Sequence, residues 1–346
     1  MSTPTDEITI LGATGWTATI CAEHIAKTFP TNTRWCIAGR SAAKLEALRR
    51  DLRAINPDRL EPDTYVIPQL EGEGLDPLVK NTKVLINGIG PYHRHGTPVV
   101  EACARDGTHY LGFSTETAWI AQMIRDFHEV AKISGAIIIP AIPGLSAQSD
   151  LVASQTCGQE KQGTFGSWLR PTLGHLATSF VAWGNESVVQ RSAALNPKIY
   201  GQNFVYKEYS PATGLISALL MHIVTKLGIL LLAVPWFRSF VRGKSFDRGS
   251  GPDRDESHKI ESAEWKAVGY VTGKKEPVAF AKFNYKGALV DMAAILAVEA
   301  AATINQMNKS EATGAGPLTP STLGITFVDR FRAAGFDLTV DGLESH

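Results

Sequence analysis

The sequence predicts an α/β protein: a parallel sheet followed by a second, α+β domain whose sheet is largely antiparallel. Three observations carry this prediction. Near the N-terminus, a short apolar strand runs directly into a glycine loop and then a helix. Strand-like apolar runs then alternate with helical patterns as far as residue 142. Further on, two alternating runs flank Gly273-Lys274-Lys275, a pattern typical of a β-hairpin.

The length of the chain predicts how many domains it has. A chain of 346 residues, at about 150 residues per domain, predicts two domains. We expect residues 1–145 to form a dinucleotide-binding domain and residues 146–316 to form a substrate or dimerisation domain. Residues 317–346 are then expected to return to the first domain, and a homodimer is one expected assembly.

Composition limits the class of protein. Lys plus Arg and Asp plus Glu both number 34, so the basic excess typical of a nucleic-acid binder is absent. The four cysteines are far apart, which gives no zinc or redox motif, and no metal-ligand helix is visible. The N-terminal residues lack the basic region of a signal peptide. We therefore expect a cytoplasmic protein with no nucleic-acid partner and no metal.

The first strand and loop predict a Rossmann-type dinucleotide site. Residues 7–11 form the strand, and Gly12, Gly15 and Ala18 follow it in the spacing G-x-x-G-x-x-A. Gly12 allows the tight turn, Gly15 lets the backbone approach a pyrophosphate, and Ala18 keeps the helix close to the sheet. The helix N-terminus offers N–H groups to the phosphates. A turn that binds nothing is the alternative. The predicted contacts are Gly12, Thr14, Gly15, Trp16 and Thr17.

The end of the second strand predicts which dinucleotide binds. The strand covers residues 33–38 and ends at Gly39, Arg40 and Ser41. An NAD site usually places an acid here for the ribose 2′-hydroxyl, and this chain has none. The Arg40 guanidinium suits a 2′-phosphate instead, with Ser41 beside it. We therefore predict NADP(H), although Arg40 as an ordinary surface arginine is the alternative.

The remaining elements of the first domain follow in order. The next strand, starting at Val84, ends in a loop where Gly88, Gly90 and Pro91 are expected to pass close to the dinucleotide, because ligands bind beyond the carboxyl ends of parallel strands. A helix is expected to start at Thr97 or Pro98 and to run through Ala104. The pattern then predicts a strand at 107–113, a helix at 118–133 and a strand at 135–140.

These motifs together resemble a known family. The ordered set is Gly12-Ala13-Thr14-Gly15-Trp16-Thr17, Ala38-Gly39-Arg40-Ser41, Gly90-Pro91-Tyr92, Gly107-Thr108-His109-Tyr110 and, near the end, Pro317-Leu318-Thr319-Pro320-Ser321-Thr322. It is similar to the saccharopine dehydrogenase-like oxidoreductase family, including the group called trans-acting enoyl reductases. The resemblance covers nearly the whole chain. It implies a Rossmann domain, NADP(H) or NAD(H) binding, and reduction of a lipid-like or polyketide-like substrate rather than lysine metabolism.

The chain departs from that family at two acidic motifs. Members show Asp-Leu-x-Gly-Glu where this chain has residues 112–116, of which only Glu116 is retained as an acid. Members also show Asp-Ser-x-Pro-Ser-Asp, and here Leu145 replaces the first acid while Ser146, Ser149 and Asp150 remain. These differences bear on which reaction the protein catalyses, whereas the predicted cofactor site keeps the family's motifs.

Candidates for the chemistry lie in the loops of the first domain. Hydride transfer belongs to the cofactor, and the protein must supply a proton donor beside it. Tyr92 is the first candidate, because it follows the loop expected to face the nicotinamide. His93 and His95 are its candidate partners. Glu116 is an acid/base candidate or a residue that stabilises a helix start. Asp150 is expected to cap a helix beginning at Leu151, and Asn185 one over 186–194.

Residues 215–240 form the most apolar segment of the chain. His222 and Lys226 interrupt the segment, and the unbroken stretch 227–237 is too short to cross a bilayer. Cationic residues follow directly at 238, 242 and 244. The segment is expected to be an interfacial helix, a lid over an apolar substrate, or a buried core or dimer helix. We therefore expect a cytoplasmic protein that can also bind peripherally to a membrane or lipid droplet.

Three functions agree with these observations. The first is an NADP(H)-dependent reductase of an enoyl or carbonyl group in a small apolar substrate. The second is a non-redox isomerase or cyclase on the same scaffold, and the third is a lipid-surface protein with a vestigial cofactor site. The fold alone does not choose among them, because function resides in the site.

Overall fold

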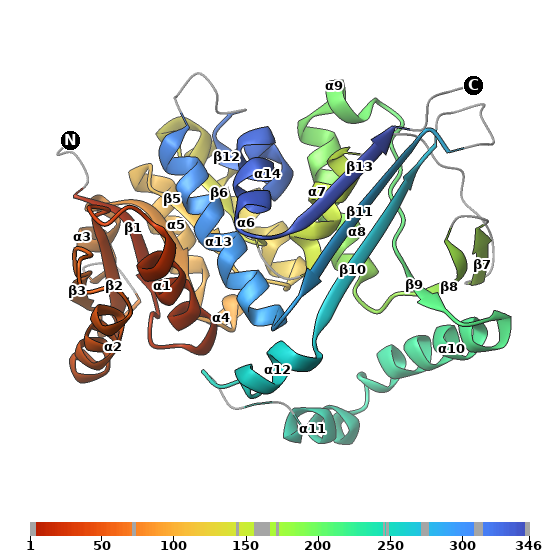
Figure 1. Cartoon of the computed structure of the whole chain (residues 1–346), viewed down its shortest axis with the longest axis horizontal. Helices are drawn as coiled ribbons and strands as arrows, with labels where there is room; N and C mark the ends of the chain where they lie inside the picture. Colours follow the sequence, from red (N-terminus) through yellow and green to blue (C-terminus); the bar gives the residue numbers. More distant parts are fainter. Residues whose placement is uncertain are drawn as a thin grey trace.

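A computed structural model describes residues 5–70, 74–142, 145–155, 167–170, 173–244, 246, 249–270, 277–307 and 314–342. Its largest element is a seven-stranded parallel sheet with the strand order β12-β6-β5-β4-β1-β2-β3 (Figure 1). This confirms the predicted parallel sheet. The strands are β1 (Asp6–Leu11), β2 (Trp35–Gly39), β3 (Asp63–Val66), β4 (Thr82–Asn87), β5 (His109–Gly112), β6 (Ile137–Ile139) and β12 (Gly316–Pro317).

Helices cover both faces of this sheet, because its central strands are apolar on both sides. One face packs against α1 (Trp16–Thr28), α2 (Ala42–Ile55), α7 (Leu145–Gln155), α13 (Leu289–Gln306) and α14 (Gly324–Ala333). The other face packs against α3 (Asp76–Lys80), α5 (Thr97–Asp106) and α6 (Thr117–Ser134). Tyr92–His95 form a single helical turn, α4, and Pro320–Leu323 form a short 3-10 helix.

The second part of the chain contains two three-stranded sheets. In one, β10 (Ser262–Gly269) pairs antiparallel with β11 (Ala279–Lys286), which pairs with β13 (Asp337–Gly342). The predicted hairpin and antiparallel domain are thus confirmed, while the turn at 273–275 lies outside the described residues. The other sheet joins β7 (Ser167–Arg170), β8 (Gly174–Thr178) and β9 (Tyr209–Ala212). The helices of this second part include α8 (Ala182–Leu195), α9 (Pro197–Tyr200) and α12 (Arg254–Ile260).

Two segments connect the large parallel sheet to the second part of the chain. Helix α13, within the stretch assigned to the second domain, packs on α1 and β4. The C-terminal segment adds β12 to the large sheet and β13 to the hairpin sheet. The domain boundaries at 145 and 316 therefore stay a prediction. By length and composition α13 could cross a membrane, but 72% of its apolar window is buried inside the molecule, as in a core helix.

The apolar segment forms two helices rather than one. Helix α10 (Leu215–Leu231) and helix α11 (Pro235–Gly243) are bent by 107° relative to each other, and as a pair they also pass the length and composition test for a span. Pro235 begins α11, where its fixed backbone angle favours the first turn of a new helix. Both helices lie along one edge of the molecule, next to α12 and the β7-β8-β9 sheet (Figure 1).

Candidate active site

The loop from β1 to α1 has the shape that the glycine spacing predicts. Gly12 has a φ of +76°, the left-handed region that favours glycine. The N–H groups of Gly12 and Ala13 donate to the Ala38 carbonyl at 2.8 and 3.1 Å, which ties the loop to the end of β2. Gly15 precedes α1 and provides no side-chain cap. The first-turn N–H groups of α1 therefore lack a capping side chain and suit a phosphate.

Close contacts around this loop explain its small residues. A Cβ added to Gly12 would lie 2.6 Å from Ile89 Cγ1, and one added to Gly88 would lie 2.7 Å from the Cβ of Ala18. Side chains there would push α1 and the β4 loop apart. A Cβ on Gly15 would lie 3.2 Å from the Gly12 carbonyl oxygen and 4.0 Å from the Gly88 carbonyl oxygen. Gly15 is thus less constrained by the fold than Gly12.

Arg40 lies where a 2′-phosphate would be recognised. It follows β2 directly, is exposed, and makes no ion pair with any residue that the structure describes. Ser41 has a structural task, because its Oγ accepts a hydrogen bond of 3.4 Å from the Lys44 N–H and caps α2. Lys44 is also exposed, one helical turn along. The local charge is positive, and the residues present fit NADP(H).

Tyr92 does not face a substrate. Its side chain is buried, and its hydroxyl donates to the Asn87 carbonyl at 2.7 Å and accepts from the Phe113 N–H at 2.9 Å. Burial raises the pKa of Tyr92 well above its usual range. The expectation that Tyr92 faces the nicotinamide therefore needs correction: its hydroxyl joins the loops after β4 and β5.

Glu116 and His93 form a pair at the same edge of the sheet. Glu116 Oε1 accepts from the Tyr92 N–H at 2.7 Å, and Oε2 accepts from the His93 N–H at 2.9 Å. The His93 ring contributes Nδ1, 2.6 Å from Oε2. Burial raises the pKa of Glu116, but these hydrogen bonds outweigh it and lower the pKa overall. Glu116 stabilises the start of α4 and orients the His93 ring, whereas His95 is half-buried without a described contact to either residue.

A largely apolar cavity of about 870 Å³ adjoins this pair. It begins where β5 and β6 end, and α6 and α8 form its walls. His93, Glu116, Trp119 and Trp183 are among its lining residues. The carboxyl ends of parallel strands are where α/β proteins bind ligands, so this cavity is the candidate substrate site. Its walls could not be predicted from local sequence patterns, because α6 and α8 are far apart in the chain.

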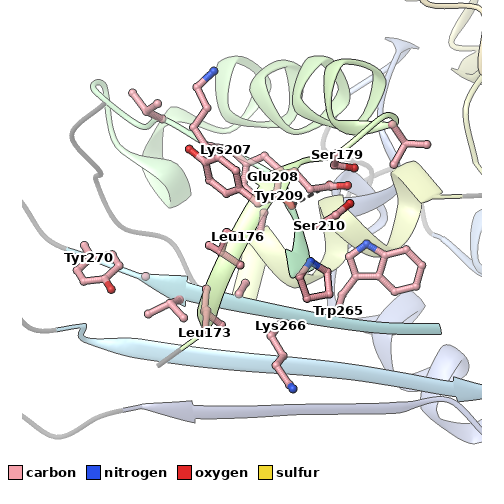
Figure 2. Close-up of a pocket in the computed structure, with 18 of the residues that line it drawn as sticks. Leu173, Leu176, Ser179, Lys207, Glu208, Tyr209, Ser210, Trp265, Lys266 and Tyr270 are labelled. Atoms are coloured by element: carbon pink, nitrogen blue, oxygen red, sulfur yellow. Dashed lines mark hydrogen bonds between the residues drawn. The ribbon is translucent and has the colours of Figure 1, made fainter. Parts of the chain in front are cut away.

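A second cavity, of about 340 Å³, lies between the β7-β8-β9 sheet and β10 (Figure 2). Glu208 in its lining receives hydrogen bonds from Ser149 at 2.6 Å, Asn185 at 2.7 Å and Tyr206 at 3.2 Å. Burial raises the pKa of Glu208 despite these bonds. The Asn185 amide oxygen also accepts from Ser146, so one hydrogen-bonded chain runs between the two cavities.

Two predicted helix caps are wrong. Asp150 lies inside α7, and its carboxylate accepts from Ser192 Oγ and, at 2.8 Å, from the Ser321 N–H. Burial raises the pKa of Asp150 to about 6, although the hydrogen bonds oppose this. Asn185 lies inside α8 and binds Glu208. Both residues join distant segments because buried polar groups need partners.

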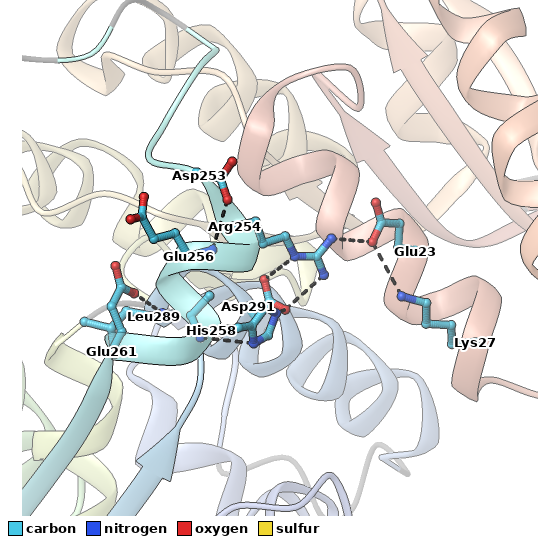
Figure 3. A network of polar contacts seen from close by, with 10 residues as sticks. Glu23, Lys27, Asp253, Arg254, Glu256, His258, Glu261, Leu289 and Asp291 are labelled. Carbon is cyan, nitrogen blue, oxygen red and sulfur yellow. Dashed lines mark hydrogen bonds and ion pairs between the residues drawn. The ribbon is translucent and has the colours of Figure 1, made fainter.

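A strap from the second part of the chain, residues 249–254, contacts the start of α1. A Cβ on Gly251 would lie 2.5 Å from the Trp16 ring, so the backbone there touches the indole. Arg254 fixes the strap through bonds of 2.7 and 2.9 Å to Asp291 and 2.6 Å to Glu23 of α1 (Figure 3). His258 Nε2 lies 2.9 Å from the same Asp291. No local sequence signal indicated this contact.

Comparison with known proteins identifies the first domain. The family model "Saccharopine dehydrogenase NADP binding domain" matches residues 8–139. This region of the chain therefore resembles a saccharopine dehydrogenase NADP-binding domain in its sequence. The cofactor predicted from Arg40 agrees with the family of the domain, and the resemblance stated from the motifs is confirmed.

Curated relatives match less than half of the chain. A protein named "Trans-acting enoyl reductase" from Mycobacterium ulcerans is 33% identical over 145 residues, covering 42% of this chain and 34% of the relative. A "Lipid droplet localized protein" from Caenorhabditis elegans is 28% identical over 147 residues, with the same two shares. The matched region thus spans about a third of the length of these relatives.

A solved structure matches nearly the whole chain. It is the apo saccharopine dehydrogenase (L-Glu forming) from Saccharomyces cerevisiae, with a TM-score of 0.51 and 10% identity. The match covers 97% of this chain and 99% of the yeast protein. At this identity it shows the fold alone, a parallel-sheet domain joined to a second domain with antiparallel sheets.

Proposed function

We propose that this protein is an NADP(H)-dependent oxidoreductase that reduces an enoyl or carbonyl group of an apolar, lipid-like or polyketide-like substrate. The observation that carries the proposal is the apolar cavity at the ends of β5 and β6, which adjoins the His93–Glu116 pair in a molecule with an NADP-binding domain. The name of the mycobacterial relatives supports the enoyl chemistry.

The cofactor contacts that we propose follow from the geometry. Backbone groups of the glycine loop and the start of α1 would hold the pyrophosphate, and Arg40 would hold the 2′-phosphate. The β4 loop would pass beside the dinucleotide. Bound NADPH would supply the hydride. These contacts involve Gly12, Thr14, Gly15, Trp16, Thr17, Arg40, Gly88, Gly90 and Pro91.

His93 is the proton donor that we propose in place of Tyr92. Reduction leaves negative charge on the substrate, and a donor in the cavity must neutralise it. His93 lines the cavity, and its Nδ1 is held by Glu116, which leaves Nε2 for a substrate. Glu116 acts through His93 as a positioning residue. The apolar walls exclude water and select a substrate with an alkyl chain.

Replacing His93 tests this assignment. In His93→Gln, turnover should fall by about a hundredfold or more, the usual contribution of a general acid, while NADPH affinity stays unchanged. The measurement is NADPH oxidation with a series of long-chain 2-enoyl thioesters and alkyl ketones. Arg94→Gln, an exposed neighbour, is the matched control and should keep wild-type turnover. Equal turnover in both variants would show that His93 is not the donor.

For localisation, we propose a cytoplasmic protein that works in contact with lipid. The name of the Caenorhabditis elegans relative supports lipid contact. An apolar cavity of this size also suits a substrate that resides in a lipid phase.

A further inference from the structure

Helices α10 and α11 expose an apolar surface that no described part of the chain covers. Ile216 is 84% exposed and Trp236 is 67% exposed. Soluble monomers seldom leave so much contiguous apolar area in water, so such a surface usually has a partner. We call it the α10–α11 surface, and its members exposed by half or more are Leu215, Ile216, Leu219, Leu220, Ile223, Val224, Leu227, Leu230, Trp236 and Phe240.

One side of α10 is attached to the body of the protein. Ala218 is fully buried, and His222 Nδ1 lies 2.6 Å from Thr178 Oγ1 of β8. The helix therefore lies along the β7-β8-β9 sheet. It has 17 residues, or about 25 Å at 1.5 Å per residue, and α11 turns away by 107°. A bilayer core is about 30 Å thick, so this arrangement favours lying on a membrane over crossing one.

The charge of this segment points to the partner. Between Glu208 and Asp247 the sequence contains no acidic residue, but it contains Lys226, Arg238, Arg242 and Lys244. On α11, Arg238 and Arg242 are four residues apart and share a face, away from Trp236 and Phe240. None of the four cations makes an ion pair with a described residue. A symmetric dimer through this surface would bring like charges together, whereas anionic lipid headgroups would attract them.

We propose that the α10–α11 surface docks on the surface of an anionic phospholipid bilayer. The apolar side chains of α10 and the aromatic residues of α11 enter the boundary between headgroups and acyl chains. Arg238, Arg242 and Lys244 bind the headgroup phosphates. The docking does not depend on the redox reaction, and it extends the general lipid contact proposed above to a named surface and a lipid charge.

Vesicle flotation of the full-length protein tests the proposal. Wild type should bind vesicles that contain phosphatidylserine and bind pure phosphatidylcholine vesicles more weakly. The Arg238→Gln/Arg242→Gln variant should bind the anionic vesicles about thirtyfold more weakly, because each cation near an anionic surface contributes about 1 kcal/mol. The Ile216→Glu/Leu230→Glu variant should lose binding to both vesicles.

Controls separate docking on lipid from misfolding, spanning and dimer formation. Ile133→Glu removes an equally exposed isoleucine, at 86%, from α6 outside this surface and should leave flotation unchanged. NADPH titration of every variant checks that it is folded. Because this titration is independent of vesicle binding, it also tells a failure of the reductase assignment from a failure of docking. The proposal is overturned if wild type does not bind anionic vesicles, or if Ile216→Glu/Leu230→Glu binds like wild type. Resistance to carbonate extraction would overturn it in favour of a spanning segment, and a dimer dissolved by Ile216→Glu/Leu230→Glu would overturn it in favour of a second copy as the partner.

Discussion

Gly15→Val should fold normally and lose NADPH binding by about a hundredfold or more. The backbone angles of Gly15 are extended, at φ −82° and ψ 155°, so a β-branched residue is compatible with them. A Cβ there would lie 3.2 Å from the Gly12 carbonyl oxygen and 4.0 Å from that of Gly88, so the loop needs to shift by only a few tenths of an ångström. The valine methyl groups, however, would occupy the space of the pyrophosphate and break charge-assisted bonds of about 1.5–3 kcal/mol each. Fluorescence of bound NADPH measures the loss.

The neighbouring glycine provides the contrast. Gly12→Val should unfold or aggregate, because the residue has a positive φ and its Cβ would collide with Ile89. Thermal unfolding of both variants separates a damaged site from a damaged fold. Normal NADPH binding by a folded Gly15→Val protein would mean that the loop is only a structural turn.

Arg40→Ala should remove most of the preference for NADPH over NADH. In the wild type we expect NADPH to bind about ten- to a hundredfold more tightly than NADH, because the guanidinium pairs with the 2′-phosphate. The variant should lose NADPH affinity by that factor and keep its NADH affinity, since NADH has no 2′-phosphate. Calorimetric titration of both dinucleotides measures this.

An exposed arginine on α2 serves as the control. Arg50→Ala removes the same charge from the same domain and should leave both affinities within about twofold of wild type, because exposed charges act weakly at a distance. Equal wild-type affinities for NADPH and NADH would contradict the role given to Arg40, as would a parallel loss of both in Arg40→Ala.

Local sequence signals predicted the first domain well. Gly12 and Gly15 mark two short-range features, a left-handed turn and a helix start. Such features depend on residues near one another in the chain, so spacing alone reveals them. The β10–β11 hairpin was predictable for the same reason.

Long-range contacts limited the prediction of the site. Asp150 and Asn185 belong to residue types that cap helices, but their partners lie 23 to 171 residues away, which turns them into buried links instead. Tyr92 was placed against the cofactor because its loop is there, but the direction of its side chain depends on Asn87 and Phe113. Pro235 was a local signal for the break between α10 and α11, but the apolar run on either side of it favoured a single segment.

Deuterium transfer to lipid is the most direct test of reduction by NADPH. The wild-type protein would be incubated with a total lipid extract of the cells that make it and with NADPH deuterated at both C4 positions. We expect a lipid that gains one deuterium for each NADPH oxidised, and no transfer by Gly15→Val. A lipid that changes structure without deuterium or NADPH oxidation would indicate an isomerase or cyclase. The absence of deuterium from every lipid would contradict the reductase assignment.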